Sequence, residues 1–427
     1  MALAPDHGQP GPAGLRKEGS GFDLPIALAV LAASHQIPAE RLALHAAVGE
    51  LALDGRVRPV PGALVAAEAA RRAGLDRLIC PPESAAEAAL AGIEPVPVEH
   101  LAEAGAYLRG LAEPRHVDPP PRDLVGGGPD LADVRGQERA RRALELAAAG
   151  RHNLLLAGPP GTGKTMLARR LPGTLPALTI EQALEVTRIH SVAGLLPAGR
   201  PLIDRPPFRA PHHTASTAAI VGGGSGPRPG EASLAHQGVL FLDELAEFYR
   251  PALEALRQPL EDGTIAIARV QGHAVFPARF VLVGTMNLCP CGGRGDPAAE
   301  CSCSPQRLSA YRDKLSRALL DRFDLVVQVP RARALELDGA AGEASAVVRE
   351  RVEAAAVRLR DPPSLSEPAA ALLTRAVDSL PLSGRGRARV SRVAGTIAAL
   401  AGAGTVAAEH VAEALSYRSP TELGSWT

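Results

Sequence analysis

The chain has 427 residues, of which 46% are hydrophobic, and this is enough for roughly two to four domains with sizeable cores. Lys and Arg together number 46, as do Asp and Glu, so bulk charge gives no support for nucleic-acid or membrane binding, and any basic surface must be local. No apolar run reaches the ~18 residues of a transmembrane helix and no signal peptide is visible, so we expect a cytoplasmic protein with no membrane partner.

The first part of the chain indicates a small α/β unit between two segments rich in Pro and Gly. Residues 1–16 are expected to be disordered, residues 17–113 to form the unit, and residues 114–130 to form a linker. Helical periodicity and short apolar runs predict two helices and two strands within the unit. The helices are expected at 23–34 and 62–74, and the strands at 77–80 and 93–98.

The middle of the chain, residues 131–330, contains apolar runs that alternate with helical stretches. Strands that are apolar throughout are typical of a parallel sheet covered by helices on both faces. Residues 331–427 form a further unit, in which the periodicity up to residue 420 predicts helices only. The apolar runs are NLLLA at 153–157, VLFL at 239–242, FVLVG at 280–284 and LVVQV at 325–329.

The segment GPPGTGKT at 158–165 fits the pattern G-x-x-x-x-G-K-[ST] and lies between a predicted strand and a predicted helix, as a phosphate-binding loop does. Its glycines let backbone N–H groups surround the phosphates, while Lys164 is placed to reach the β- and γ-phosphates and Thr165 to bind Mg²⁺. Of the 46 basic residues only Lys17, Lys164 and Lys314 are lysines, so Lys164 stands out. The alternative is a chance Gly-rich turn.

Two further predicted strands end in polar residues that suit ATP chemistry. VLFLDE ends in Asp243, placed to hold the Mg²⁺ shell, and Glu244, placed to polarise the attacking water. FVLVGTMN ends in Asn287, placed to orient that water. The alternatives are an acidic helix start and an ordinary turn asparagine. The predicted cofactor-binding residues are Gly158, Pro159, Pro160, Gly161, Thr162, Gly163, Lys164, Thr165 and Asp243, with Thr165 and Asp243 as the Mg²⁺ ligands.

LLDRFDL at 319–325 places Arg322 between two acids immediately before the last predicted strand. An arginine that reaches the γ-phosphate held by a neighbouring subunit stabilises the charge of the transition state. The alternative is an ordinary salt bridge to Asp321 or Asp324, and the sequence leaves both open.

In this order and spacing, GPPGTGKT, LDE, GTMN and LLDRFD resemble the magnesium-chelatase branch of AAA+ ATPases. RPPFRAPHHTAS at 205–216, PRPGEASLAHQGVLFLDELAEF at 227–248, LCPCGG at 288–293 and CSCSP at 301–305 resemble the ComM/YifB subfamily, and the resemblance covers about residues 17–420. It implies an AAA+ P-loop αβα core with a parallel sheet, a C-terminal helical lid and an N-terminal partial Lon-protease-like α/β domain. It also implies a homohexamer that uses ATP and Mg²⁺ to move single-stranded or branched DNA, as in branch migration during natural transformation and recombination.

The lid segment LSGRGRARVSRVA at 382–394 resembles the motif that carries a second phosphate-sensing arginine. Position by position the resemblance assigns this role to Arg385, with Arg389 and Arg392 as alternatives. The predicted catalytic residues are therefore Glu244, Asn287, Arg322 and Arg385.

The segment KEGSGFDLPIALAVLA at 17–32 resembles the Lon-protease fold, but a Ser-Lys catalytic dyad needs a later lysine in the same domain. None occurs between Lys17 and Lys164, so proteolysis is not expected and Ser20 is interpreted as a turn or cap residue. The match begins near residue 16, and the sequence leaves open whether the natural start lies upstream or this domain is degraded.

Two segments are candidates for DNA contact, because insertions in the core of the resembling families line the ring pore. Residues 205–230 carry basic side chains and no acid, and residues 263–280 predict a hairpin. Basic loops at a pore suit sequence-independent phosphate tracking, although local loop packing is an alternative for the histidines. The candidates are Arg205, Arg209, His212, His213, Arg228, Arg269 and His273, with Phe208 and Phe276 as the available aromatic side chains.

Four of the five cysteines form two C-x-C pairs. Four thiolates within 15 residues could bind Zn²⁺ tetrahedrally, although C-x₂-C is the more typical spacing and a reduced loop without metal is the alternative. A structural zinc would stiffen the loop that follows Asn287. The cysteines are Cys289, Cys291, Cys301 and Cys303.

Three functions remain open at this point. A DNA translocase predicts ATP hydrolysis that DNA stimulates and salt weakens. A magnesium-chelatase-type motor subunit, which remodels a protein partner, predicts stimulation by that partner and indifference to DNA, but the N-terminal domain and the cysteines argue against it. A non-catalytic scaffold conflicts with the complete set Lys164, Thr165, Asp243, Glu244 and Arg322.

Overall fold

The structure is a computed structural model that describes residues 20–117, 128–197, 199–224, 227–269, 272–333, 336, 338–380 and 382–418. The chain divides into two compact units, Met1–Asp123 with Thr179–Asp204, and Leu124–Leu178 with Arg205–Thr427. Segment 1–16 and most of segment 114–130 lie outside the described residues, so the disorder and linker expectations stay untested.

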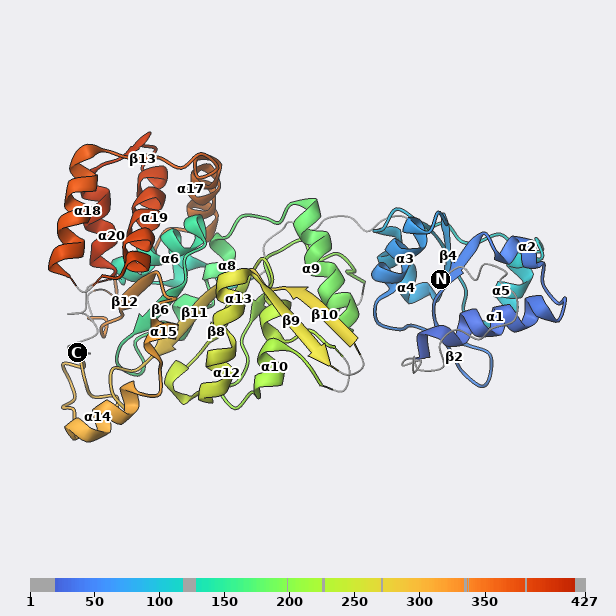
Figure 1. The fold of residues 1–427 in the computed structure, drawn as a ribbon, viewed down its shortest axis with the longest axis horizontal. Helices are drawn as coiled ribbons and strands as arrows, with labels where there is room; N and C mark the ends of the chain where they lie inside the picture. Colours follow the sequence, from blue (N-terminus) through green and yellow to red (C-terminus); the bar gives the residue numbers. More distant parts are fainter. Residues whose placement is uncertain are drawn as a thin grey trace. The chain divides into compact units, whose positions relative to one another are not determined.

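The first unit is α/β, as its sequence pattern predicts (Figure 1). A parallel three-stranded sheet has the order β1-β4-β5, and β2 and β3 form an antiparallel pair. The two helices and two strands expected here are all present, as α1, α3, β4 and β5. The elements are α1 (Asp23–Ala33), α2 (Ala39–Leu42), β1 (His45–Ala47), β2 (Glu50–Leu51), β3 (Val57–Arg58), α3 (Ala63–Arg72), β4 (Arg77–Cys80), α4 (Pro82–Ala89), β5 (Glu94–Pro97) and α5 (Leu101–Leu108).

Helix α9 (Ile180–Ala193) groups with the first unit, although the sequence places it inside the expected 131–330 core. A capping box starts it, in which Thr179 and Gln182 satisfy each other's backbone N–H groups. Its Arg188 pairs with Glu68 of α3 at 2.7 Å, and the Ser191 hydroxyl donates to Glu87 of α4. These contacts join sequence-distant segments, which is why helical periodicity alone does not reveal them.

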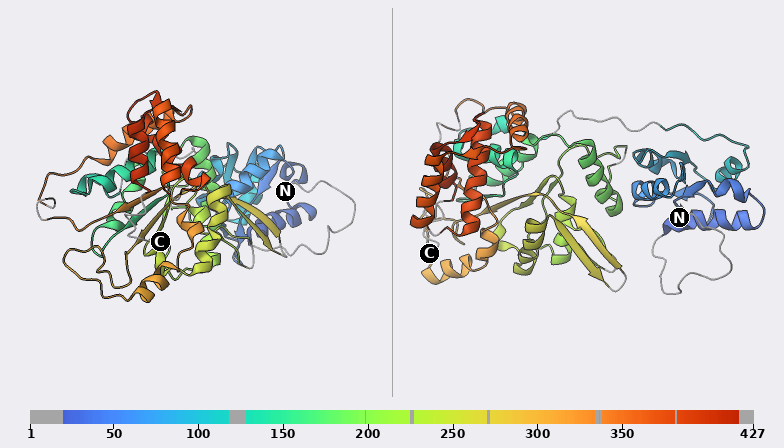
Figure 2. Two further views of the ribbon diagram at one scale, coloured as in Figure 1. Left: turned by 60° about the vertical axis from the view of Figure 1, so that its left-hand side comes forward. Right: turned by 45° about the horizontal axis from the view of Figure 1, so that its top comes forward.

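The second unit is built on a five-stranded parallel sheet with the order β12-β6-β11-β8-β7 (Figures 1 and 2). All four apolar runs are strands, as predicted. The strands are β6 (Leu154–Ala157), β7 (Phe208–Arg209), β8 (Val239–Leu242), β11 (Val281–Met286) and β12 (Leu325–Gln328).

Successive side chains of a strand point to opposite faces of the sheet. All four residues of β6 are buried, so both faces of the sheet are covered. Leu154 and Leu156 of β6 join a core shared with α6 (Glu138–Gly150) and the C-terminal helices, while Leu155 and Ala157 join the core beneath α10, α11 and α12. The predicted αβα arrangement is therefore confirmed. The other helices of this layer system are α7 (Lys164–Ala168), α8 (Leu171–Thr174), α10 (Thr217–Val221), α11 (Glu231–Leu234), α12 (Arg250–Ala255), α13 (Arg257–Asp262), α14 (Pro305–Arg312) and α15 (Arg317–Leu320).

The C-terminal segment is a helical layer that packs on α6 (Figure 2). The expectation of helices only is incomplete, because the loops before α18 and α20 pair as a short parallel ladder. Two-residue strands are too short to produce a sequence pattern. The elements are α17 (Ser345–Arg358), β13 (Ser364–Leu365), α18 (Glu367–Ser379), α19 (Gly384–Leu400), β14 (Thr405–Val406) and α20 (Ala408–Ser416).

Candidate nucleotide site and arginine cleft

The loop between β6 and α7 has the backbone that a phosphate-binding loop needs. Gly161 and Gly163 have φ of 74° and 89°, in the left-handed region that only glycine adopts at little cost. Gly158 lies so close to the residue after β12 that a Cβ there would be 2.3 Å from the Val329 carbonyl oxygen. Glycine is therefore required at these positions by geometry as well as by the motif.

Lys164 lies at the centre of this loop. Its ammonium group donates to the carbonyl oxygens of Gly158 at 2.8 Å and Pro159 at 2.6 Å, and to Asn287 Oδ1 at 3.2 Å. Burial lowers the pKa of Lys164, while the nearby carboxylates Asp243 and Glu244 act in the opposite direction. The structure thus brings the loop lysine and the asparagine that follows β11 into direct contact.

The acidic end of β8 lies beside the same loop. Thr165 Oγ1 donates to both carboxylate oxygens of Asp243, at 3.2 and 3.0 Å. Glu244 follows with φ of 55°, an uncommon conformation for a non-glycine residue that is found at functional sites. A threonine hydroxyl and a carboxylate at this separation are hard oxygen donors of the kind that Mg²⁺ prefers, so these residues fit an ATP–Mg²⁺ site.

Sheet order explains this convergence. Strand β11 lies between β6 and β8, so the segments that follow these three parallel strands meet at the carboxyl edge of the sheet. Ligands of open α/β sheets bind at this edge.

Sequence reasoning missed Thr285, which organises this edge. Its hydroxyl donates to Asp243 Oδ1 and accepts the backbone N–H of Glu244 at 3.0 Å. The side chain is 1% exposed, within a strand that is otherwise apolar. A polar residue inside the run FVLVGTM is the signal that could have identified it.

Arg322 lies at the opposite edge of the same sheet, because it precedes β12 rather than following a strand. It lines a cleft of about 450 Å³ with residues that precede β6 and β11. The four residues of β6 or β12 separate the two edges by about 13 Å at ~3.3 Å per residue. Six arginines and three acids line the cleft, namely Arg151, Arg279, Arg322, Arg385, Arg389 and Arg392 with Glu261, Asp262 and Asp324.

Arg322 itself is only partly satisfied. Its guanidinium pairs with Glu261, while its Nε has no hydrogen-bond partner among the described residues, although the side chain is only 6% exposed. Burial, and then the charges of Arg389 and Arg385, lower its pKa. The sequence left open an ordinary salt bridge from Arg322 to Asp321 or Asp324. In the structure the acid that pairs with Arg322 is Glu261 of α13 instead.

Helix α19 presents the three lid arginines to this cleft at spacings of four and three residues, which place them on one face. Arg392 binds Asp324 at 2.7 Å and Arg389 lies 3.7 Å from the same carboxylate. Arg385 has the loosest contact, 3.8 Å from Glu261, and its side chain is 72% exposed. Arg385 is thus the lid arginine with the greatest freedom to bind an added anion.

A buried polar network that the sequence did not reveal adjoins the cleft at Asp324. His152 is fully buried, with Nε2 2.8 Å from Thr396 Oγ1 and Nδ1 3.9 Å from Asp324. Burial lowers the pKa of His152 to about 4, with smaller opposing and reinforcing effects of Asp324 and Arg392. The network joins the core to α19.

The segment 205–230, predicted as a basic insertion, is only partly free for DNA. Arg209 forms a two-point ion pair with Glu231, at 2.6 and 2.8 Å, because this acid lies one residue beyond the insertion. Arg228 and His212 are exposed, and the His212 and His213 rings lie against each other at a tilt of 33°, with centroids 4.1 Å apart. Arg205 is half-buried and has other interactions.

The predicted hairpin is present as β9 (Thr264–Arg269) and β10 (Gly272–Pro277), paired antiparallel. The Arg269 side chain lies outside the described residues, whereas His273 is exposed. The two candidate loops adjoin, because a Cβ on Gly222 would be 2.8 Å from Ile267 of β9. The structure therefore places both candidate DNA segments on one part of the second unit.

The four clustered cysteines converge. Their sulfur atoms all lie within 4.8 Å of one another, and Cys289 Sγ is 3.3 Å from Cys291 Sγ. Backbone N–H groups, first that of Gly293, lower the pKa of Cys291 to about 5, while burial raises that of Cys289. These thiols suit a soft divalent metal.

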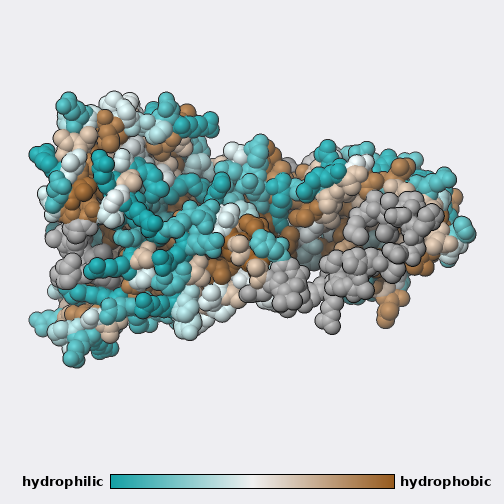
Figure 3. Space-filling view, in the orientation of Figure 1, coloured by the Kyte–Doolittle hydropathy of each residue, from teal (hydrophilic) through white to brown (hydrophobic). Residues whose placement is uncertain are grey.

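Ser20 forms no dyad in the described part of the first unit. Its hydroxyl donates to Glu50 Oε2 at 2.5 Å, at the start of a 3-10 turn. Among the described residues no helix is long and apolar enough to cross a membrane, and the face of the second unit seen in Figure 3 is largely hydrophilic.

Three family descriptions match the chain. "Magnesium chelatase, subunit ChlI" matches residues 130–337, "Subunit ChlI of Mg-chelatase" matches 11–84, and "Magnesium chelatase, subunit ChlI C-terminal" matches 355–418. These matches include the nucleotide site, part of the first unit and most of the lid helices.

Full-length relatives give the same result. The chain is 49% identical to an uncharacterized protein of Mycobacterium tuberculosis over 95% of this chain and 85% of the relative. It is 42% identical to the uncharacterized protein YifB of Escherichia coli (96% and 84%), and 42% identical to the competence protein ComM of Haemophilus influenzae (96% and 85%). The chain belongs to the ComM/YifB family of magnesium-chelatase-like AAA+ ATPases, whose cofactors are ATP and Mg²⁺.

Proposed function

We propose that this protein is a ring-shaped DNA motor, a homohexamer in which each ATP lies between two subunits. One subunit supplies the phosphate-binding loop, and its neighbour supplies Arg322 and the lid arginine Arg385. The motor acts on single-stranded or branched DNA.

The single observation that carries the composite site is the position of Arg322. It lies at the amino edge of the sheet, about 13 Å from the carboxyl edge where Lys164 lies, so a nucleotide bound at Lys164 is out of its reach in the same subunit. Arg322 is a buried guanidinium whose Nε has no partner in the described part of the chain, and it lies in a cleft where arginines outnumber acids, so it is suited to an incoming phosphate. A second copy of the chain offers that phosphate, and repeating this head-to-tail contact closes a ring.

Each residue of the carboxyl edge then has a role. ATP and Mg²⁺ supply the transferable phosphoryl group and neutralise its charge. Lys164, which now donates to loop carbonyl oxygens, would bind phosphate oxygens, and Thr165 and Asp243, now hydrogen-bonded to each other, would hold the cation. Glu244 accepts the proton of the attacking water and Asn287 orients that water. Thr285 fixes the acids through its two hydrogen bonds.

DNA is the proposed substrate because two lines of support agree. The relative from Haemophilus influenzae is a competence protein, and competence concerns uptake of DNA. The exposed side chains of Arg228, His212 and His273 lie on two adjoining loops of the second unit, where Arg228 offers a positive charge and the histidines offer hydrogen bonds to a phosphate backbone.

Steady-state ATP hydrolysis with and without single-stranded and forked DNA tests this function, with Glu244→Gln as the inactive control. Stimulation by DNA that weakens as salt rises supports a DNA motor. Hydrolysis that no form of DNA alters would exclude DNA as the substrate, and a protein client of the chelatase type would become the candidate.

A further inference from the structure

We propose that Cys289, Cys291, Cys301 and Cys303 bind one Zn²⁺, and that the zinc-bound loop holds Asn287 in place at the nucleotide site. The metal site stands on its own geometry. Its effect on ATP hydrolysis rests on the function proposed above.

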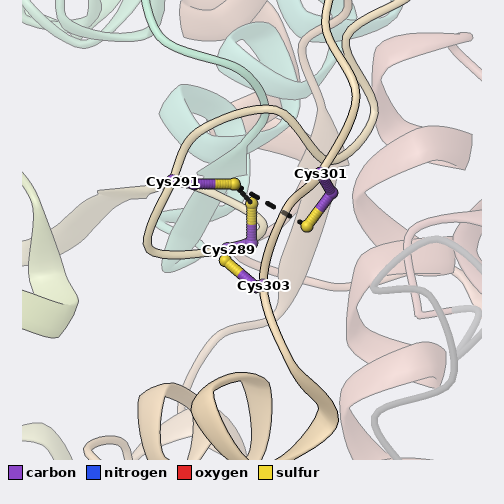
Figure 4. Close-up of side chains that lie close together, drawn as sticks. All are labelled: Cys289, Cys291, Cys301 and Cys303. Carbon is purple, nitrogen blue, oxygen red and sulfur yellow. Dashed lines mark hydrogen bonds between the residues drawn. The ribbon is translucent and has the colours of Figure 1, made fainter.

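The four sulfur atoms occupy the corners of a metal-sized space (Figure 4). A tetrahedral site with Zn–S bonds of about 2.3 Å has sulfur–sulfur edges of about 3.8 Å. Here Cys289 Sγ and Cys291 Sγ are 3.3 Å apart, Cys291 Sγ and Cys301 Sγ are 3.7 Å apart, and all four lie within 4.8 Å. Small side-chain rotations are therefore enough to bind the ion.

The two C-x-C segments are held side by side by the backbone between them. Gly293 has no side chain because a Cβ there would lie 2.7 Å from the Glu300 carbonyl oxygen. The sulfur separations are far longer than the ~2.05 Å of a disulfide, and all four cysteines are free thiols. The arrangement is thus that of a closed tetrathiolate site.

Backbone N–H groups point at the sulfur atoms from within the loop. The N–H of Arg294 donates to Cys289 Sγ at 3.2 Å, and those of Gly293 and Ser302 donate to Cys291. Such N–H···S hydrogen bonds disperse the negative charge of metal-bound thiolates and orient them. A cluster of hydrophobic packing cysteines would not need these donors.

The loop that carries the cysteines also contacts the phosphate-binding loop. Gly292, with φ of 80°, packs so closely on Pro160 that a Cβ would be 2.7 Å from its Cγ. Asn287, two residues before the first cysteine, accepts from Lys164 through its side chain and from the Tyr311 hydroxyl through its carbonyl oxygen, at 3.2 and 3.1 Å. Loss of the metal would free the segment that sets the position of Asn287.

Metal content tests the site directly. The full chain is purified under reducing conditions, and zinc is measured by mass spectrometry for wild type, Cys301→Ser, Asn287→Ala and Cys80→Ala. Cys80, buried in the first unit, is the matched control. We expect one zinc per chain in wild type, Asn287→Ala and Cys80→Ala, and none in Cys301→Ser. Cobalt added to the zinc-free chain should give the visible spectrum of a tetrahedral tetrathiolate.

Hydrolysis tests the coupling. We expect Cys301→Ser and Asn287→Ala each to lower the rate of ATP hydrolysis about tenfold, as loss of an outer-shell contact does, and Cys80→Ala to leave it unchanged. Removal of zinc from wild type with a chelator, followed by its return, should lower and restore the rate without any substitution.

The outcomes separate the two proposals. Absence of zinc and of a thiolate cobalt spectrum, or iron in place of zinc, would overturn the zinc site whatever the hydrolysis rate. If wild type binds zinc and Cys301→Ser hydrolyses ATP at the wild-type rate, the proposed effect of the zinc-bound loop on hydrolysis would be overturned. Zinc binding in a wild-type chain that hydrolyses no ATP would leave the metal site intact and sink the proposed function.

Discussion

The two edges of the central sheet differ in how completely their charges are paired. At the carboxyl edge Lys164 makes three hydrogen bonds, and Thr165 and Thr285 both bind Asp243. At the amino edge six arginines face three acids, and the Nε of the buried Arg322 has no partner among the described residues. The first edge is complete within one chain, whereas the second has spare capacity for an anion.

This difference explains why a single subunit is not a complete enzyme in our account. The groups that bind phosphate follow the strands of the sheet, whereas Arg322, which would stabilise charge, precedes one of them. A strand length separates them, so only a neighbouring copy can bring them together. A substitution at one edge should therefore leave the other edge intact.

Arg322→Ala should have the largest effect. We expect hydrolysis to fall by about 10³-fold, the lower range for loss of an arginine that acts on a neighbour's γ-phosphate. Nucleotide binding, measured with a fluorescent ATP analogue, should be nearly unchanged because the carboxyl edge is intact. Arg375→Ala, an exposed arginine on α18 outside the cleft, is the control. If Arg322→Ala lost nucleotide affinity by as large a factor as it lost hydrolysis, this arginine would belong to the nucleotide site of its own subunit.

Glu244→Gln should lower hydrolysis by about 10²-fold or more, because the amide cannot accept a proton from the attacking water. The same variant should still bind ATP and assemble, as sizing chromatography with ATP would report. Glu247→Gln, three residues on and paired with Lys314 on the surface, should retain full activity. If Glu244→Gln kept ATP hydrolysis within a few-fold of wild type, Glu244 would not be the group that accepts the proton of the attacking water.

His152 should make the amino edge sensitive to acid. In the unfolded chain His152 takes up a proton as the pH falls below its ordinary pKa of 6.5. In the folded chain burial lowers the pKa of His152 to about 4, so the proton binds only at lower pH. Stability is therefore lost as pH falls from 6.5 towards 4, by up to about 3 kcal/mol.

Urea unfolding at pH 7 and pH 4.5 measures this loss. His152→Gln should lose less stability than wild type between the two pH values, and His273→Gln, which changes an exposed histidine on β10, should behave as wild type does. An identical pH dependence in wild type and His152→Gln would contradict the assignment.

The smallest effect concerns DNA. Arg228→Ala should weaken DNA binding several-fold and reduce the slope of log affinity against log salt by about 1, as loss of one phosphate contact does. Arg209→Ala should leave that slope unchanged, because Glu231 already neutralises this arginine. A salt slope that falls with Arg209→Ala but not with Arg228→Ala would reverse the assignment.

The sequence was sufficient for the features that depend on local pattern. The four core strands are predominantly apolar, and the motif at 158–165 follows one of them, so both could be predicted from neighbours in the chain. The hairpin at 263–280 was likewise predictable from alternating residues around a turn.

Features that depend on contact between distant segments could not be predicted. The partner of Arg322 is 61 residues away on α13, and His152 meets Thr396 across 244 residues. The grouping of α9 with the first unit depends on Glu68 and Glu87, which no periodicity connects to it. Pairings of this kind are fixed by tertiary packing, which one sequence does not display.

Subunit mixing tests the central claim most directly. Lys164→Ala lacks a working carboxyl edge and Arg322→Ala lacks a working amino edge, so each alone should hydrolyse almost no ATP. In an equal mixture about a quarter of the head-to-tail interfaces combine two intact edges, and hydrolysis should reappear in that proportion. A mixture as inactive as its two components, although the subunits exchange freely, would contradict a site shared between neighbouring chains.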